Sequence, residues 1–264
     1  MEESAQVDRA AGDRIPPFEH PPRRTLEGWG TLRSLEGWGT LLPRAFFEAP
    51  PELAAPRLLG KVLAHRTGSL VLAGRIVEAE AYLGPHNDPP DPAAHAHGGP
   101  TPRNSVLFGP AGHAYVYAIY GRYFCMNVSC EVEGRAGCVL LRALEPLGGA
   151  DGAEVAQMIR NRGLAHGGRS ESRLVRQLAS GPGRLCQALG ITRLRHNGLD
   201  LAYPASPLQI RDDGYAVTEV LATARIGIHE AVDWPLRFVL PGNRCVSGAK
   251  NAIGKQVPLS VEFD

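Results

Sequence analysis

The chain has 264 residues, of which 44% are hydrophobic, and it carries 28 Lys and Arg against 27 Asp and Glu. This length and composition provide enough apolar surface for a packed core, which excludes a disordered chain. No run approaches the 18 or more apolar residues of a membrane span, and the first residues lack the pattern of a signal peptide. We therefore expect no membrane partner and an intracellular protein, in the cytoplasm or nucleoid if the source is bacterial.

Cysteine usage agrees with an intracellular location. The five cysteines are odd in number and form no C-x-x-C pair. This pattern fits reduced thiols better than a disulfide framework or a zinc site. We expect them to be small buried hydrophobic residues.

Charge is unevenly distributed, although the formal net charge is only +1. Of the 28 basic residues 25 are arginines, the side chain best suited to forked phosphate contacts, although a GC-rich genome would favour them as well. Residues 1–53 carry a net charge of −3, whereas residues 155–199 carry eight arginines and one acid. The neutral average thus hides a basic segment that would suit a nucleic-acid partner.

Residues 1–42 are expected to form a flexible extension, because prolines and charges occur there without sustained apolar periodicity. The sequence LEGWGT at 26–31 recurs at 35–40. A local duplication is one explanation, and a docking motif built on Trp29 and Trp38 is the other.

From about residue 43 the pattern becomes that of a globular domain. In chain order it predicts a helix over 53–63 that leads through Gly60 into a strand, and then strands over 70–82, 113–119, 123–129 and 137–144. Helices over 152–162 and 180–190 follow, and then strands over 217–228 and 236–240. Asp151 and Glu154 have the spacing of a capping box for the helix over 152–162. This order favours one mixed α+β domain, and no nucleotide-binding glycine motif is present.

The predicted strand over 70–82 carries two carboxylates and a tyrosine on one side. Strict alternation places one set of side chains together and the other set opposite: Arg75, Val77, Ala79 and Ala81 against Ile76, Glu78, Glu80 and Tyr82. Spacing alone favours a solvated strand face for the two glutamates. The adjacent tyrosine favours instead a general base beside an aromatic platform, as a hydrolase acting on a flat substrate needs.

The loop over 84–104 is rich in proline, glycine and histidine. His86, Asp91, His95 and His97 could bind a metal, but a proline-rich loop without a recognised ligand spacing is a weak signal. We expect neither a metal nor another cofactor. A single histidine that stacks or hydrogen-bonds in a pocket wall is the better interpretation.

The strands over 113–119 and 123–129 predict a β-hairpin with Tyr120 at its tip. Five of the chain's 17 aromatic residues lie within ten positions here, and cross-strand packing would explain most of them. A tyrosine at the tip cannot pack inside its own hairpin. With Arg122 beside it, Tyr120 has the character of a wedge that enters between base steps.

Eight ordered motifs resemble the alkyladenine (3-methyladenine) DNA glycosylase family. They are GRIVEAEAYLG (74–84), TPRN (101–104), GHAYVYAIYG (112–121), FCMN (124–127), LLRALEP (140–146), SGPGRLCQAL (180–189), ARIGI (224–228) and LRF (236–238). The resemblance covers about 43–247 and implies one glycosylase domain there, with a C-terminal tail over 248–264. The implied fold is α+β, with a curved antiparallel sheet, flanking helices and a protruding hairpin.

The resemblance implies a monomeric, monofunctional enzyme of DNA base excision repair that works without a cofactor. Its partner would be double-stranded DNA that contains an alkylated or deaminated purine, which is flipped out and hydrolysed to leave an abasic site. The chain's three lysines lie outside the motifs, so no lyase step is expected. The alternatives are a non-catalytic binder of distorted nucleic acid and a metal-dependent hydrolase.

Roles for single residues follow from their places in the motifs. Glu80 would be the general base that activates water, and Arg142 an active-site arginine near that water and the DNA backbone. Tyr82 and His95 would sandwich the flipped base, and Tyr117 would complete the stack.

Other positions concern selectivity and DNA contact. Asn127 would exclude normal guanine by a clash with its exocyclic amino group, and Tyr120 would fill the space that the flipped base leaves. Arg103, Arg122 and Arg184 are candidate DNA contacts. Arg122 stands at the hairpin tip, where the family leads us to expect a hydrophobic residue.

Overall fold

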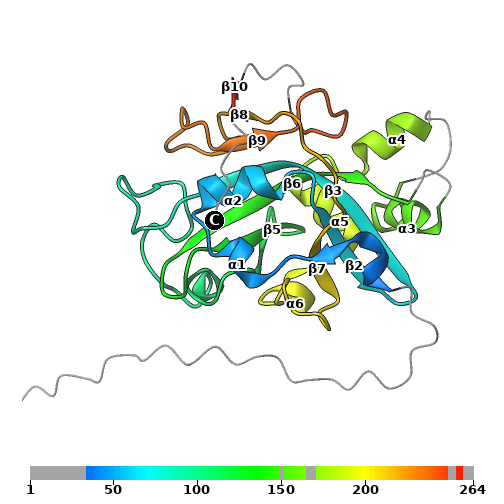
Figure 1. Ribbon diagram of the computed structural model, residues 1–264, viewed down its shortest axis with the longest axis horizontal. Helices are drawn as coiled ribbons and strands as arrows, with labels where there is room; N and C mark the ends of the chain where they lie inside the picture. The colour runs from blue at the N-terminus through cyan, green and yellow to red at the C-terminus, as the bar shows by residue number, and fades with distance from the viewer. Residues whose placement is uncertain (1–33, 149–151, 165–170, 249–253, 258–264) are drawn as a thin grey trace, which may run out of the picture.

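An open antiparallel sheet forms the centre of the protein, with helices and long loops packed around it (Figure 1). The structure, a computed structural model, describes residues 34–148, 152–164, 171–248 and 254–257. In this part the strand order is β1-β7-β2-β3-β6-β5-β4, and β9, β8 and β10 continue from β3. The strands are β1 (Thr40–Leu41), β2 (Val62–Thr67), β3 (Leu70–Tyr82), β4 (Ala114–Ile119), β5 (Tyr123–Cys130), β6 (Gly137–Pro146), β7 (Leu208–Asp212), β8 (Leu221–Thr223), β9 (Arg237–Val239) and β10 (Lys255–Gln256).

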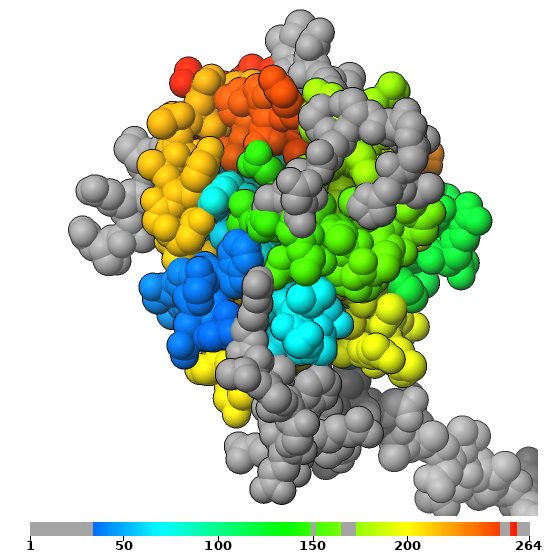
Figure 2. Space-filling view, turned by 90° about the vertical axis from the view of Figure 1, so that its right-hand side faces the viewer, coloured from blue at the N-terminus to red at the C-terminus, as the bar shows by residue number. Residues whose placement is uncertain are grey.

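The helices are short and lie between the strands in the sequence. They are α1 (Arg44–Phe47), α2 (Pro51–Leu58), α3 (Ala153–Asn161), α4 (Glu171–Leu178), α5 (Pro182–Leu189) and α6 (Arg193–His196), with 3-10 turns η1 (Leu35–Trp38) and η2 (Ser105–Phe108). Side chains of α2, α3, α4 and α5 join those of β3, β5 and β6 in the main hydrophobic core. Figure 2 views the molecule from the side on which α3 and α4 lie in Figure 1. The predicted α+β class is confirmed.

A β-bulge in β3 decides which of its side chains enter the core. The register with β6 shifts on both sides of Glu78. Ile76 and Val77, although adjacent, both belong to the main core, while Arg75 and Glu78 do not. The prediction that placed Ile76 with Glu78 and Glu80, and Arg75 with Val77, is therefore wrong, because the extra residue of a bulge reverses the alternation.

The predicted helix over 53–63 is wrong at both ends. The α2 helix begins at Pro51, where a proline in the first turn loses no hydrogen bond, and it ends at Leu58. The chain then turns at Gly60, whose φ of +83° suits glycine, and enters β2. The apolar residues of 53–63 belong to two elements, the end of α2 and the start of β2. A buried helix end and a buried strand have the same apolar composition, so the sequence pattern does not show where the helix ends.

The later helices agree better with prediction. The α5 helix has Pro182 in its first turn and ends on left-handed Gly190. The α3 helix follows Gly152, and Glu154 lies in its first turn. The expected cap Asp151 lies outside the described residues.

The strand predicted over 217–228 is wrong beyond its centre. Only Leu221–Thr223 pair as β8, and the chain from 224 to 236 is irregular. Gly227 and Ala231 both have positive φ angles, which a strand does not allow. This irregular stretch runs alongside the pocket described below.

Part of the expected N-terminal extension packs on the sheet. The β1 strand pairs with β7, Leu35 and Leu42 are buried, and Trp38 packs against the cluster formed by β2 and β3. The first copy of the LEGWGT repeat lies outside the described residues, and β10 of the expected tail pairs with β8. The division of the chain at 42 and 248 stays a prediction. All five cysteines are buried free thiols.

Candidate active site

Two glutamates of β3 and an arginine of β6 form a buried ion cluster. Arg142 donates from Nε to Glu78 Oε1 at 2.8 Å and from Nη1 to Glu80 Oε2 at 3.2 Å. Both glutamates have an exposed fraction of 0%. The interpretation of a solvated strand face is therefore wrong, because segments far along the chain cover this side of β3.

Glu78 is the fixed anion of the cluster. It also accepts hydrogen bonds from Arg237 Nε at 2.8 Å and from the backbone and hydroxyl of Ser247 at 2.6 and 2.9 Å. Burial alone would raise the pKa of Glu78, but the positive charges of Arg142 and Arg237 hold that pKa below its usual value. Glu78 therefore stays ionised and orients Arg142.

Glu80 has a different environment. The N–H of Ile226 donates to Oε1 at 2.8 Å, and the hydroxyl of Tyr82 donates to Oε2 at 3.0 Å. Burial raises the pKa of Glu80, and Arg142 offsets this only in part. The two glutamates thus have pKa values displaced in opposite directions, as occurs when neighbouring carboxyl groups serve different roles.

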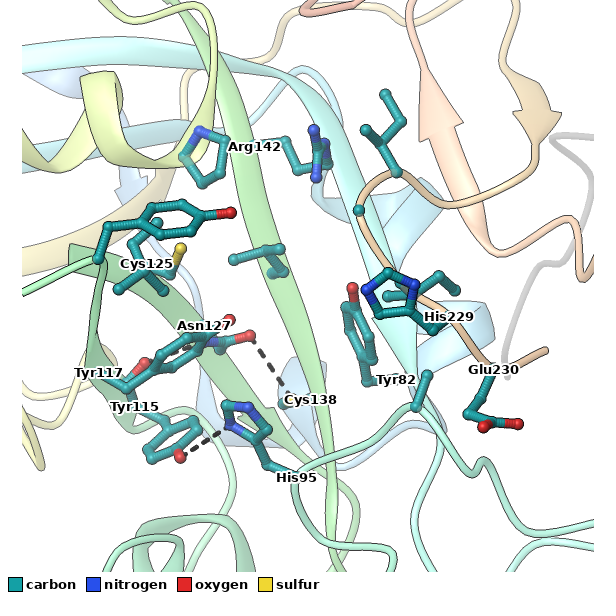
Figure 3. A pocket seen from close by; sticks show the side chains of 18 residues that line it. Tyr82, His95, Tyr115, Tyr117, Cys125, Asn127, Cys138, Arg142, His229 and Glu230 are labelled. Carbon is teal, nitrogen blue, oxygen red and sulfur yellow. Dashed lines mark hydrogen bonds between the residues drawn. The ribbon is translucent and has the colours of Figure 1, made fainter. Parts of the chain in front are cut away.

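A pocket of about 520 Å³ lies beside this cluster, and it is lined by Arg142 and Tyr82 but not by Glu78 or Glu80, which lie behind them. Figure 3 shows Tyr82 on one side of it, Tyr115, Tyr117 and His95 on the other, and Arg142 beyond. The His95 and Tyr117 rings touch, with centroids 4.5 Å apart and planes at 65°. The predicted aromatic residues are thus brought together as two facing walls, which would admit a flat ring.

A buried ion pair fixes the wall that carries Tyr82. The Arg225 guanidinium lies 4.6 Å from the centroid of the Tyr82 ring and pairs with Asp91, for which Nη2 and Oδ1 are 2.9 Å apart. Asp91 also accepts from the backbone of Leu83 and Ala93, so it joins β3 to the loop that bears His95. Both charged side chains are fully buried.

This arrangement does not favour a metal site in the loop. Asp91 is committed to an arginine rather than to histidines. In the part of the chain that the structure describes, no group of three or more His, Cys, Asp and Glu could hold a metal ion.

The opposite wall presents neutral groups. Burial, and then the charge of Arg103, lower the pKa of His95, whose Nδ1 lies 3.0 Å from the Tyr115 hydroxyl. Asn127 is 3% exposed, and its side-chain amide donates to the carbonyl of Tyr115 at 3.1 Å. Its Oδ1 accepts from Cys138 Sγ at 3.7 Å, so the amide has a fixed orientation.

The hairpin tip and the candidate arginines lie at the surface. Tyr120 is 90% exposed, has a φ of +49° and stands at the pocket's edge. The guanidinium carbon of Arg122 lies over the ring of Tyr123, 4.9 Å from its centroid. Arg103 is exposed near the pocket wall, and Arg184 is exposed on α5. The predicted hairpin tip is confirmed.

Comparison with known proteins gives one family. The family model described as methylpurine-DNA glycosylase matches residues 45–244. A relative from Koribacter versatilis is 52% identical over 209 residues, covering 79% of this chain and 94% of the relative. Relatives from Methanoculleus marisnigri and Rhodopseudomonas palustris are each 46% identical, covering 78% of this chain and 98% and 88% of their own lengths. All three are named "Putative 3-methyladenine DNA glycosylase".

The chain belongs to the methylpurine-DNA glycosylase family. The sequence resemblance is thereby confirmed, and this glycosylase is a hydrolase of N-glycosyl bonds in DNA. Helices long and apolar enough to cross a membrane do not occur in its described residues.

Sequence reasoning missed part of the glycosylase site. The irregular stretch Ile226, Gly227, Ile228, His229 and Glu230 also lines the pocket. The ARIGI motif in this stretch carries part of the family resemblance, but its apolar composition predicts a strand. Ser247 lies 169 residues from Glu78, and no local pattern links them.

Proposed function

We propose that this chain, acting as a monomer, excises alkylated and deaminated purines from double-stranded DNA by hydrolysis and leaves an abasic site. The observation that carries the proposal is Glu80, a buried carboxylate with a raised pKa beside a pocket with aromatic walls. A carboxylate of this kind is a stronger base than an ordinary surface glutamate.

Hydrogen-bond capacity supports a water on Glu80. An ionised carboxylate offers about four lone-pair sites. Three donors occupy Glu80 in the structure, namely Ile226 on Oε1 and Tyr82 and Arg142 on Oε2. The remaining site, on Oε1, would accept a hydrogen bond from the attacking water.

In the proposed step, Glu80 takes a proton from that water as its oxygen bonds to the anomeric carbon of the flipped nucleotide. The N-glycosidic bond breaks, and its electron pair leaves with the purine. An alkylated, positively charged purine thereby departs as a neutral molecule. Arg142, which donates to Glu80, would keep this carboxylate ionised before it takes the proton. No metal or lysine adduct takes part, so the enzyme would have no lyase activity.

The pocket walls suit such a base. The flipped purine would stack between Tyr82 on one side and Tyr117 and His95 on the other. The lowered pKa keeps His95 neutral, so the wall does not repel a cationic base. Electron-rich rings attract such cations, which would favour alkylated purines over normal ones.

Asn127 is proposed to discriminate against guanine. Its amide is held by Tyr115 and Cys138 and cannot turn freely, so a 2-amino group would meet a fixed polar obstacle. Replacing Asn127 by Ser should permit release of undamaged guanine, measured as free base. An unchanged ratio of guanine release to hypoxanthine release would contradict this role.

The decisive experiment compares Glu80→Gln with wild-type protein in single-turnover assays on duplexes that contain hypoxanthine or ethenoadenine. Loss of a catalytic base costs about 10²–10⁴-fold in rate, while the affinity for lesion DNA should be retained. Glu145→Gln is the matched control, since Glu145 lies on the neighbouring strand, outside the pocket, and bonds to Asn243. Normal cleavage by Glu80→Gln would remove the assigned base.

Two other outcomes would select the alternatives. Binding of distorted duplexes without release of any base from a panel of lesions would favour a non-catalytic binder. Loss of wild-type activity in EDTA would favour metal-dependent hydrolysis.

A further inference from the structure

A second hollow, also of about 520 Å³, is lined by four arginines that come from three separate segments. Arg173 and Arg176 belong to α4, Arg184 belongs to α5, and Arg244 follows β9. We refer to these four residues as the arginine groove. Among the described residues that line it there is no aspartate or glutamate.

The groove concentrates positive charge. Like charges gathered around one hollow repel one another, and a bound anion relieves that repulsion. Arg162 adds a further positive charge near Arg184: burial lowers the pKa of Arg162 most, and the charge of Arg184 lowers it further. Planar guanidinium groups match the geometry of phosphate oxygens, so a phosphate is the anion that fits best.

The arginine groove adjoins the catalytic cluster through two short segments. Ser180 and Val246 line the groove, and their atoms Oγ and O lie 3.5 Å apart. The next residue of each segment contacts Arg142: the N–H of Gly181 donates to its carbonyl at 3.0 Å, and the hydroxyl of Ser247 lies 3.4 Å from its Nη2. A DNA strand that delivers a nucleotide to the pocket would therefore pass next to the groove.

We propose that the arginine groove binds backbone phosphates of the damaged strand beside the flipped nucleotide. This inference rests on the proposed function and specifies where the strand runs. Phosphate contacts set the register of a protein on DNA without reading sequence, so the groove would hold the duplex whichever base is damaged. It also accounts for the basic segment over 155–199, which supplies three of the four arginines.

The test measures the salt dependence of binding to a duplex that carries a hypoxanthine, by fluorescence anisotropy. Each phosphate contact contributes about 0.9 to the slope of log K against log salt. The double variant Arg173→Gln/Arg244→Gln should lower the slope by about two and weaken binding at every salt concentration. Arg173→Lys/Arg244→Lys keeps both charges and should keep the slope.

Arg66→Gln is the control for charge, and it removes one positive charge where the double variant removes two. Arg66 lies at the opposite end of the β2–β3 hairpin from Glu80, and its removal changes the net charge without touching the groove. Phosphate-ethylation interference with the wild-type protein should mark positions on the damaged strand next to the lesion, and the Gln double variant should lose that interference. Circular dichroism confirms that each variant is folded.

A slope and a footprint unchanged in the Gln double variant would overturn the inference. An equal loss per charge removed in Arg66→Gln would overturn it as well, because net charge alone would then explain the effect. These results are independent of catalysis. Failure of the proposed function appears instead as wild-type protein that releases no base.

Discussion

The guanidinium carbon of Arg225 lies 4.6 Å from the centroid of the Tyr82 ring, on which it stacks. This contact joins the aromatic wall of the pocket to the buried Arg225–Asp91 ion pair. The hydroxyl of Tyr82 also donates a hydrogen bond to Glu80. The position of the wall and the position of the proposed base are therefore coupled.

Removing one partner of that ion pair should damage both stability and activity. Asp91→Asn leaves Arg225 buried without its counter-charge, so we expect a loss of about 3 kcal/mol in the free energy of unfolding. The double variant Asp91→Asn/Arg225→Met should regain part of the stability but not the rate of base release, because Tyr82 loses its stacked cation. Urea denaturation and single-turnover assays measure the two effects. Strictly additive stability losses would contradict the coupling.

The two glutamates of β3 should respond oppositely to neutralisation. A carboxyl whose folded pKa is raised stabilises the fold only at low pH, and this contribution is lost as the pH rises through the folded pKa. Charged Glu80 therefore costs stability at pH 7, and Glu80→Gln should raise the melting temperature slightly. The lowered pKa of Glu78 has the opposite sign, so Glu78→Gln should cost about 3 kcal/mol. Thermal unfolding of both variants checks this, and a matching decrease in both would contradict it.

The acid limb of the activity profile should report on Glu80. Base release needs the carboxylate, so the rate should fall as the pH drops through the pKa of Glu80, which lies above the ordinary value of 4.5. Tyr82→Phe keeps the ring but removes the hydroxyl that stabilises the charged form. The limb should then move to higher pH. If the acid limb of Tyr82→Phe stays at the pH of the wild-type limb, the group that titrates in this profile is not Glu80.

A buried histidine pair should make the fold sensitive to acid. His65 Nε2 and His196 Nε2 lie 3.0 Å apart, and His65 Nδ1 lies 2.7 Å from the Leu189 carbonyl, which can only accept. His196 Nδ1 lies 3.0 Å from the backbone nitrogen and 3.1 Å from the carbonyl oxygen of Thr192. These partners assign His65 as protonated on Nδ1 and His196 as the donor between the rings. Protonating His65 would remove the acceptor of that bond.

Burial lowers the pKa of His65 from 6.5 to about 4. For a base with a lowered folded pKa, stability is present above pH 6.5 and is lost as the pH falls toward 4. We expect the free energy of unfolding to decrease with a limiting slope of about 1.4 kcal/mol per pH unit in that window. His65→Gln, which can still accept from His196, should flatten the dependence, while His97→Gln on the surface should not. Urea denaturation of the three proteins between pH 4 and pH 7 measures this pH dependence of the free energy of unfolding.

The exposed tyrosine at the hairpin tip should matter for duplex substrates and not for folding. Tyr120→Ala should change stability by less than about 0.5 kcal/mol, since the side chain is 90% exposed. Excision from duplex DNA should fall more than excision from a single strand, where no stacked base pair must be opened. Tyr203→Ala removes another exposed tyrosine and is the control. Equal losses on both substrates would argue against a wedge.

Sequence by itself determined the elements whose signals are local. The limits of β3 are those predicted, because Gly68 and Gly84 flank a run of strand-forming residues. The hairpin tip and α5 also follow from short-range turn and cap chemistry. Motif order was enough to indicate the family, since each motif is contiguous in the chain.

Tertiary structure decided everything that depends on residues distant in sequence. It buried Glu80 under the segment of Ile226, 146 residues further on, where spacing alone favoured a solvated face. The bulge at Glu78, which changes the side of the sheet that the following β3 side chains face, also belongs to the tertiary structure. The same is true of the arginine groove, whose four arginines come from three segments. Burial and pairing depend on which surfaces meet in three dimensions, and alternation within a strand does not contain that information.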